Sequence, residues 1–430
     1  MNHDPNDAAV AGLDHYLVGG AVRDLFLGKT PKDRDYVVIN ATPDDMLARG
    51  FLVVGADFPV FLHAETKHEY ALARTERKSG RGYQGFVVST NGVTLEEDLS
   101  QRDLTMNAMA MTPDGAIIDP FNGRRDLQDG VLRHVGPAFA EDPLRVLRVA
   151  RFAAQTGFTV APETAELGRS LARSGELDTL TPERVAGELT KALGGAKPSR
   201  FFETLDEMDA LQRLFPEVAA LKGQTQPVQH HAEGDAYVHT LLVVDAAAPD
   251  PLTRFCALAH DLGKGLTPKD LLPKHHGHEA AGAPIAKALA ERLKLPNRYG
   301  ELAAKSARWH AHVHRADELT PQSFVRLFDE NGGINRLGDL EMVAAVAVAD
   351  FEGHRSALRD QYPHLTHVRA QRFMNVVTEI GKVRAHHFAD PDQIRAMGAE
   401  KLKIKLHEAR INAAKTAMRQ HVRHDPNLGR

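Results

Sequence analysis

The sequence predicts an α+β protein with one sheet-containing domain near its N-terminus and helices from there to its end. From residue 16 to about 120, short runs rich in β-branched and aromatic residues alternate with short helical segments. Beyond the turn at 115–123, apolar residues recur at helical spacing. The length of 430 residues allows roughly two to four domains, at about 150 residues each.

The composition limits the classes of function. Hydrophobic residues make up 43% of the chain and charged residues 26%, as in ordinary globular proteins. The net charge of −4 excludes a chain that is basic throughout, so any nucleic-acid-binding surface must be local. The single cysteine, Cys256, excludes an intrachain disulfide, and its apolar neighbours indicate a core residue rather than a nucleophile.

We expect a cytoplasmic protein with no membrane contact. No apolar run approaches the roughly 18 residues of a membrane span, and residues 1–15 lack the basic and apolar regions of a signal peptide. These first residues are polar, and we expect them to be disordered.

The first predicted elements are a strand at 16–18, a turn at Gly19 and Gly20, and a helix at 21–27. Such a turn lets backbone N–H groups and a helix N-terminus face an anionic group, with Arg23 nearby.

Two carboxylates follow, where a second strand opens. Asp33 and Asp35 are two residues apart, so on a strand they share a face at about 6–7 Å. Such a pair can hold divalent cations. A solvated turn is the alternative for so short a motif, but the position directly after the glycine turn favours the metal site.

Three further segments carry charged side chains, and two of them have two open interpretations each. The glycine-rich basic segment 74–86 is either a solvated hairpin connection or a flap over phosphates. Arg102 and Asp103, at a turn after a capped helix, form at least a local ion pair. In the helix that begins near Asp142, Arg145 and Arg148 share a face that either is solvated or holds an anion.

The histidines concentrate beyond a boundary expected at 224–236. His239, the pair His260–Asp261 and Asp350 all adjoin apolar helical runs. Imidazoles together with carboxylates suit borderline divalent metals such as Ni²⁺, Mn²⁺, Fe²⁺, Co²⁺ or Zn²⁺, which can ionise a water or polarise a phosphate.

The last fifty residues carry the one strong charge asymmetry. Residues 381–430 contain eleven Lys and Arg against five Asp and Glu, a formal charge of +6. This basic helical segment is either a solvated face or a contact for a phosphate backbone.

Taken together, the motifs resemble those of a known family. Five of them match the class II tRNA nucleotidyltransferases, the CCA-adding enzymes, in order and spacing over about residues 14–225: LVGGAVRD, the spaced DRD, ARTERKSGRGYQGF, QRDLTMNA and EDPLRVLRVARF. The HHGHE and HD segments resemble the long bacterial form with a C-terminal HD phosphohydrolase domain, which extends the match to about 425.

The resemblance implies a division of the chain. The first part of the chain would be a disordered start (1–15), followed by a nucleotidyltransferase head built on a small mixed or antiparallel sheet with helices (16–140). An all-α neck and body that read the nucleotide would follow (141–225), then an HD domain (226–355) and a basic helical region that contacts tRNA (356–430).

The resemblance also implies roles for individual residues in the head and neck. Asp33 and Asp35 match the catalytic carboxylates that bind Mg²⁺, and the nucleotide-binding positions are Gly20, Arg23, Arg102, Asp142, Arg145 and Arg148. The loop 74–86 resembles the flexible element that helps the site change from C to A. Gln101 departs from the family, in which many members have a second Arg, and this puts ribose or triphosphate contacts in doubt.

The implied function is template-independent addition of CCA to the 3′ end of tRNA from CTP and ATP. At the HD site, the implied metal ligands for Ni²⁺ or another transition metal are His239, His260, Asp261 and Asp350, with His260 and Asp261 catalytic and His278 and His310 as weaker candidates. The related long enzymes suggest phosphatase, 2′-nucleotidase and 2′,3′-cyclic phosphodiesterase activities suited to RNA repair, in a monomer or homodimer.

Two alternatives stay open at this point. A bacterial poly(A) polymerase shares the same head, although the HD domain and the lack of a long basic tail disfavour it. A nucleotide-binding regulatory module with HD phosphohydrolase activity would use the first site only to bind its ligand.

Overall fold

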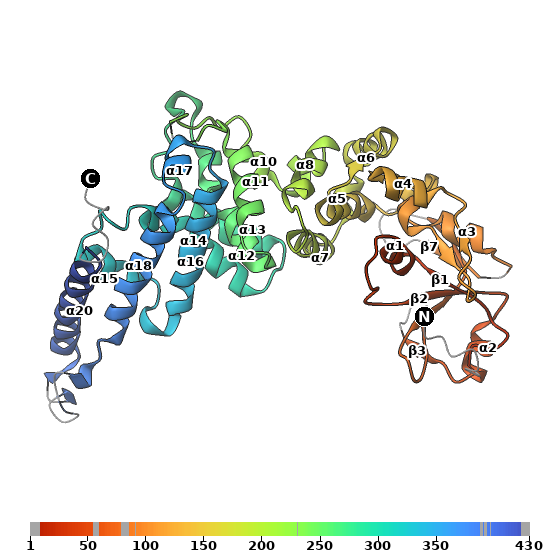
Figure 1. The fold of residues 1–430 in the computed structure, drawn as a ribbon, viewed down its shortest axis with the longest axis horizontal. Helices are drawn as coiled ribbons and strands as arrows, with labels where there is room; N and C mark the ends of the chain where they lie inside the picture. Colours follow the sequence, from red (N-terminus) through yellow and green to blue (C-terminus); the bar gives the residue numbers. More distant parts are fainter. Residues whose placement is uncertain are drawn as a thin grey trace. The chain divides into compact units, whose positions relative to one another are not determined.

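The computed structural model describes residues 9–54, 60–78, 86–90, 92–229, 231–387, 390, 394–395 and 397–422. The chain divides into two compact units, Met1–Leu214 and Phe215–Arg430 (Figure 1). All strands among the described residues belong to the first unit, and the described elements of the second are helical. The predicted α+β class is therefore confirmed.

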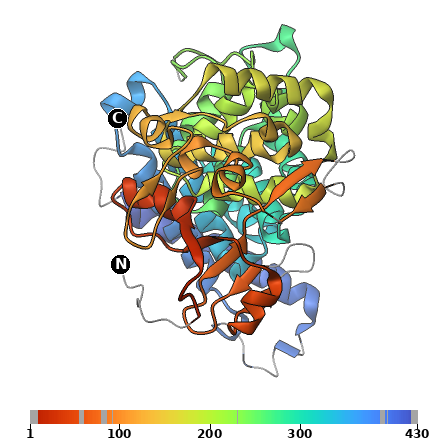
Figure 2. The same ribbon diagram turned by 90° about the vertical axis from the view of Figure 1, so that its right-hand side faces the viewer.

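A mixed sheet organises the first unit. Its strand order is β3-β4-β5-β2-β1-β8-β9, in which β2 and β5 are parallel and the other neighbours antiparallel. The strands are β1 (Asp14–Val18), β2 (Asp35–Ile39), β3 (Leu52–Val54), β4 (Val60–Leu62), β5 (Glu69–Leu72), β8 (Ala110–Met111) and β9 (Ile117–Ile118). A separate antiparallel ribbon is formed by β6 (Thr75–Lys78) and β7 (Phe86–Ser89), drawn in orange in Figure 2.

The register of β1 against β2 decides which side chains reach the site. Val18 is opposite Asp35, and Leu17 is opposite Tyr36. Because side chains alternate along a strand, Asp35 lies on the face of Val18, which packs into the core with Leu99. Asp35 thus begins its strand at the edge of that core.

The first strand begins two residues before the predicted start. Asp14 and His15 belong to β1, because they pair with Ile39 and Val38 of β2. The buried His15 ring lies near the Tyr36 and Tyr70 rings, at centroid distances of 5.9 and 6.2 Å. The expected disorder of residues 1–15 thus does not extend over Asp14 and His15, while residues 1–8 lie outside the described part.

Helices complete the first unit: α1 (Gly20–Phe26), α2 (Pro43–Ala48), α3 (Leu95–Ser100), α4 (Gly123–Asp129), α5 (Leu144–Thr156), α6 (Pro162–Ser174), α7 (Pro182–Leu193), α8 (Ser199–Glu207) and α9 (Leu211–Leu214). The short strands β10 (Val131–Leu132) and β11 (Thr159–Val160) pair in parallel. Helix α5 begins at Leu144, two residues after Asp142, with Pro143 at its cap. Asp142 still accepts a hydrogen bond from the Leu144 N–H at 3.0 Å.

The second unit is built from α10 (Pro216–Ala219), α11 (Ala236–Ala246), α12 (Pro251–Ala259), α13 (His278–Arg292), α14 (Asn297–His314), α15 (Pro321–Glu330), α16 (Leu337–Gly353), α17 (Ala357–Gln361), α18 (Leu365–Lys382) and α20 (Ala399–Val422). Helices α11 and α16 pack closely, since a Cβ at Gly353 would lie 2.8 Å from the Val243 backbone nitrogen. Ala414 of α20 is buried in a core with Phe328 and Phe373.

Two expectations about this unit can be compared with the structure. Cys256 is fully buried in α12, and burial raises the pKa of its thiol to about 12, which agrees with a core residue. Among the described residues, no helix combines the length and apolar character needed to span a bilayer.

Candidate nucleotide-binding and metal sites

A cavity of about 500 Å³ opens in the first unit where the glycine turn, α5 and α7 meet. It is lined by Gly19, Gly20, Arg23, Asp35, Arg74, Arg102, Asp103, Asn107, Asp142, Leu144, Arg145, Arg148, Phe152 and Arg184. The structure therefore brings together all six residues that the sequence analysis named for nucleotide binding. Residues 79–85 of the expected flap lie outside the described part of the chain, whereas Arg74 at its base lines the cavity.

The glycine turn gives two guanidinium groups access to this cavity. Gly19 has a φ of +69°, and a Cβ on it would lie 2.9 Å from Nη1 of Arg102. A Cβ on Gly20 would lie 3.4 Å from Nη2 of Arg23. A side chain at Gly19 would therefore both strain the backbone and displace an arginine.

The two predicted catalytic carboxylates occupy different positions. Asp35 starts β2 and lines the cavity, whereas Asp33 lies in the exposed bend before the strand and does not line it. The prediction that both belong to the strand was therefore wrong for Asp33. Burial raises the pKa of Asp35, the Asp33 charge adds to this rise, and Arg102 opposes it. A carboxylate whose anion is destabilised by burial and by a second acid gains from a bound cation, and of the two acids only Asp35 lines the cavity where such an ion would lie.

A chain of hydrogen bonds links α1 to α5 along the cavity wall. Arg23 Nη1 donates to Oδ1 of Asn107 at 2.8 Å, and Asn107 donates to Oδ1 of Asp103 at 3.0 Å. Oδ2 of Asp103 accepts from Nε and Nη2 of Arg148 at 2.7 and 2.6 Å. Burial alone would raise the pKa of Asp103, but Arg148 and the hydrogen bonds outweigh it and lower that pKa. Arg148 is thus held in place by a buried anion.

The other two side chains of the predicted nucleotide-reading helix are also held. Arg184 of α7 donates through Nη2 to the two Asp142 oxygens at 2.8 and 3.1 Å. Arg145 donates to the main-chain carbonyls of Ala138 and Gln101 at 2.8 and 2.6 Å. Because Gln101 acts here through its backbone, this contact does not depend on the side chain that departs from the family.

A buried ion pair fixes α5 against α7 behind the cavity. Nε of Arg151 lies 2.5 Å from Oε2 of Glu188, and the two side chains are 9% and 5% exposed. Sequence reasoning missed this pair and also Asn107 and Arg184. The only sequence signal for the Arg151–Glu188 pair was a basic and an acidic residue on the apolar faces of two amphipathic helices.

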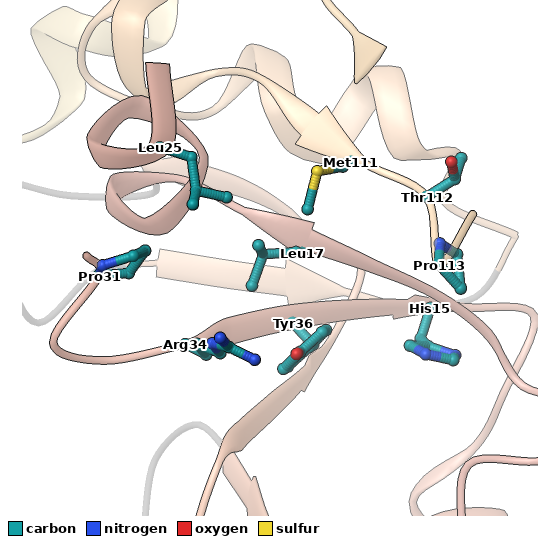
Figure 3. A pocket seen from close by; sticks show the side chains of 9 residues that line it. All are labelled: His15, Leu17, Leu25, Pro31, Arg34, Tyr36, Met111, Thr112 and Pro113. Carbon is teal, nitrogen blue, oxygen red and sulfur yellow. The ribbon is translucent and has the colours of Figure 1, made fainter. Parts of the chain in front are cut away.

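A smaller cavity of about 50 Å³ lies on the opposite face of β1 and β2 (Figure 3). His15, Leu17 and Tyr36 line it, consistent with the register of the two strands. No carboxylate from the described part of the chain lines it, and we assign it no part in the chemistry.

In the second unit, four predicted metal ligands converge from three helical segments. Nε2 of His239 lies 3.0 Å from Oδ1 of Asp350 and 3.7 Å from Oδ2 of Asp261. Nε2 of His260 lies 3.2 Å from the same Asp261 oxygen and 3.8 Å from the same Asp350 oxygen. Ligand atoms about 2.0–2.2 Å from one tetrahedral ion are roughly 3.3–3.6 Å apart. The distances of 3.0 and 3.2 Å come close to this spacing, and the ligand atoms of His239, His260 and Asp261 all lie within 4.8 Å of one another, as in a group that could hold an ion.

The hydrogen bonds of the imidazoles support this interpretation. Nδ1 donates to a main-chain carbonyl in His260 (Ala257, 2.6 Å), His278 (His275, 2.7 Å) and His310 (Ser306, 3.0 Å). This leaves Nε2 of each ring available to a metal. Nε2 of His239 and His260 and Oδ1 of Asp261 and Asp350 are buried without a hydrogen-bond partner among the described residues.

Charge also favours a cation at this position. Burial opposes ionisation of Asp261 and Asp350, but neighbouring imidazoles, with Lys264 beside Asp261, hold the pKa of each well below its usual range. His278 and His310, the weaker candidates, lie 3.2 and 3.7 Å from Oδ1 of Asp261 through Nε2.

Further residues of this site were missed. Lys264 Nζ lies 2.5 Å from Oδ2 of Asp261 and donates to Gln226 at 2.6 Å, and Glu233 is hydrogen-bonded to Nδ1 of His239 at 2.8 Å. Two of them, Gln226 and Glu233, fall within the segment 224–236 that the sequence analysis treated as a boundary. The available signal was an acid six residues before His239.

Comparison with known proteins agrees with this geometry. Family models match in three parts: a poly A polymerase head domain (15–133), a probable RNA and SrmB-binding site of polymerase A (157–222) and an HD domain (234–350). A multifunctional CCA protein of Methylococcus capsulatus is 52% identical over 83% of this chain and 86% of its own length. One from Nitrosococcus oceani is 46% identical over 94% and 99%.

Solved structures share the fold. A Bacillus stearothermophilus CCA-adding enzyme in complex with CTP has a TM-score of 0.65 at 24% identity, covering 98% of this chain and 96% of that one. A Thermotoga maritima CCA-adding enzyme in complex with tRNA has a TM-score of 0.61 at 17% identity, covering 97% and 93%.

The sheet, the arginine-lined cavity and the matched domains define a nucleotidyltransferase with an HD domain. More specifically, the chain belongs to the family of the multifunctional CCA proteins, the bacterial CCA-adding enzymes with an HD domain. The resemblance seen in the sequence is thereby confirmed.

Proposed function

We propose that the cavity of the first unit adds C, C and A to the 3′ end of tRNA by two-metal nucleotidyl transfer, without a nucleic-acid template. The observation that carries this proposal is the convergence of Asp35, six cationic side chains from α1, α5, α7 and the turns, and Asp142 on one cavity. In the reaction, the RNA 3′-hydroxyl attacks the α-phosphorus in line while pyrophosphate leaves.

The residues divide this work between them. Mg²⁺ ions held by Asp33 and Asp35 would make the hydroxyl more acidic and offset charge on the leaving oxygens. Arg23 and Arg102, beside the glycine turn, would neutralise the triphosphate. The buried Asp103 keeps Arg148 oriented toward the same ligand.

Base choice follows from donors and acceptors. Asp142 accepts from cytosine N4 or adenine N6, and Arg145 donates to cytosine N3 and O2 or adenine N1. Uracil and guanine present donors and acceptors in the opposite order on the same edge of the base. Their binding would leave polar groups unpaired, and this discriminates against them by orders of magnitude. Swapping the chemistry of the two residues should redirect selection, and unchanged selectivity in Asp142→Ala would overturn this assignment.

For the second unit we propose a metal-dependent phosphohydrolase with phosphatase, 2′-nucleotidase and 2′,3′-cyclic phosphodiesterase activities, which would repair RNA 3′ ends before addition. His239, His260, Asp261 and Asp350 would hold the ion, Ni²⁺ or another transition metal, which supplies an activated water. Lys264, buried beside Asp261, adds a positive charge next to the proposed ion.

The remaining parts are proposed to serve the same substrate in the cytoplasm. The exposed lysines of α20, Lys401, Lys403 and Lys405, would contact the tRNA backbone. The five-part division of the chain expected from the sequence and the choice between monomer and homodimer stay predictions.

The deciding experiment supplies tRNA lacking its last three nucleotides with Mg²⁺ and with CTP and ATP, separately and together, followed by 3′-end sequencing. Ordered CCA without further growth is expected. Long A-tails from ATP alone would instead favour a poly(A) polymerase. His260→Ala should abolish metal-dependent phosphohydrolysis and leave CCA addition intact, and equal loss of both activities would contradict two separate sites.

A further inference from the structure

A second group of imidazoles lies beside the four ligands of the HD site. His231, His239 and His354 each place a ring nitrogen within 4.8 Å of the other two. The ring centroids of His231 and His354 are 4.4 Å apart. Both residues fall just outside the span matched by the HD family model, 234–350. We propose that His231, His354 and Asp350 hold a second divalent cation next to the first, a proposal that rests on the proposed HD phosphohydrolase site.

A buried carboxylate orients His231 for this role. Nδ1 of His231 is hydrogen-bonded to Oε1 of Glu233 at 3.1 Å, and the Glu233 side chain is fully buried. The same oxygen accepts from Nδ1 of His239 at 2.8 Å, and Oε2 accepts from the Arg355 N–H at 3.1 Å. An imidazole that donates through Nδ1 presents the lone pair of Nε2. Glu233 therefore positions one ligand of each ion.

His354 and Asp350 supply the other contacts. His354 follows the end of α16, and its buried Nε2 has no hydrogen-bond partner among the described residues although Oδ1 of Asp350 is 3.0 Å away. Oδ1 of Asp350 is likewise without such a partner, whereas Oδ2 accepts from Nε2 of His314 at 2.7 Å. One carboxylate oxygen has two lone pairs, so Oδ1 can bridge the two ions.

These protein ligands determine which metal ions suit the site and which substrate atom would fill the open coordination positions. Two imidazoles and a carboxylate oxygen suit Ni²⁺, Co²⁺, Mn²⁺ or Zn²⁺. Three protein ligands leave coordination positions open, as in catalytic metal sites. A non-bridging oxygen of the phosphoester substrate would fill one of them, and two adjacent ions would then hold both the attacking and the leaving oxygens.

The test counts ions on the full chain. Wild type, His231→Ala/His354→Ala and His364→Ala/His367→Ala are dialysed against Co²⁺ in excess Mg²⁺, and bound cobalt is measured by atomic emission. The last variant is a matched control, because it removes two adjacent histidines of another part of the unit, whose ring centroids are 6.0 Å apart. We expect the first variant to bind one cobalt ion fewer than wild type and the control to bind the same number.

Electron paramagnetic resonance gives a second readout. Two cobalt ions bridged by Asp350 should give a coupled signal in wild type, which becomes that of an isolated ion in His231→Ala/His354→Ala. In Glu233→Gln, cobalt should bind about 10- to 100-fold more weakly at both positions, because this side chain orients His231 and His239.

The outcomes separate this proposal from the one on which it rests. An unchanged cobalt count in His231→Ala/His354→Ala, together with loss of cobalt in His260→Ala, would overturn the second position alone. Phosphohydrolysis that survives in His260→Ala would instead overturn the proposed HD activity.

Discussion

The contact between Arg184 and Asp142 offers the sharpest test of the nucleotide-reading site. Arg184 Nη2 lies 2.8 and 3.1 Å from the two carboxylate oxygens, in a pair whose side chains are 26% and 21% exposed. A hydrogen bond to a charged group contributes about 1.5–3 kcal/mol, and partial exposure reduces this to about 1–2 kcal/mol. Arg184→Ala should therefore lower kcat/KM for CTP by about 5- to 30-fold.

The same substitution should relax base choice, because Asp142 would no longer be held in its accepting orientation. The assay compares kcat/KM for CTP and UTP on tRNA that lacks its CCA end. Arg213→Ala is a matched control, since Arg213 lies at the same 2.8 Å from Asp178 in a pair that is 39% and 62% exposed. Wild-type rates and wild-type discrimination in Arg184→Ala would refute the reasoning.

Four further predictions concern stability, metal binding and RNA binding. Arg151→Met should destabilise the first unit by up to about 3–5 kcal/mol in denaturant unfolding, because it leaves Glu188 buried with only the Lys191 ion pair among the described residues, 3.8 Å from its Oε1; a loss below 1 kcal/mol would contradict a structural role. The pKa of Asp103 is lowered in the folded protein, so the stability it contributes is complete above its unfolded pKa of about 3.9 and is lost as pH falls through the folded value. Asp103→Asn should therefore reduce the loss of unfolding free energy at low pH. An unchanged loss would show that other carboxylates cause it. Removal of the HD-site ion by a chelator should lower the stability of the second unit by about 2.7 kcal/mol relative to protein with free ion at 100 times its Kd, and an unchanged melting curve would speak against the site. Finally, Lys403→Ala should weaken tRNA binding and reduce the slope of log Kd against log salt by about 0.7–0.9, whereas an unchanged slope would remove α20 from the interface.

The features predicted from the sequence were those that neighbouring residues determine. The glycine turn, the strand after Asp35 and the helix after Asp142 follow from local sequence, because side-chain alternation and capping act within a few residues. The four HD ligands could be named because His260 and Asp261 are adjacent and Asp350 follows an apolar run. The local differences were small: β1 begins two residues earlier, α5 begins at Leu144, and Asp33 lies just before rather than within its strand.

The partners of these residues could not be predicted in the same way. Arg184 lies 42 residues after Asp142 in the chain, in a helix whose own pattern shows only a buried and an exposed face. Glu233 lies in a segment with turn residues and little apolar pattern, yet its side chain is fully buried. Such pairings depend on how distant helices pack, and one sequence contains no signal for that packing.

The two sites place opposite charges around their ligands, and this difference selects what each of them binds. Six arginines and three aspartates line the cavity of the first unit, a surplus of three positive charges that favours a polyanion such as a nucleoside triphosphate. In the second unit, two buried carboxylates lie among imidazoles whose Nδ1 atoms are already hydrogen-bonded, so lone pairs converge on a space suited to a cation. Since each arrangement is complete within its own unit, a substitution at one site should leave the chemistry of the other intact.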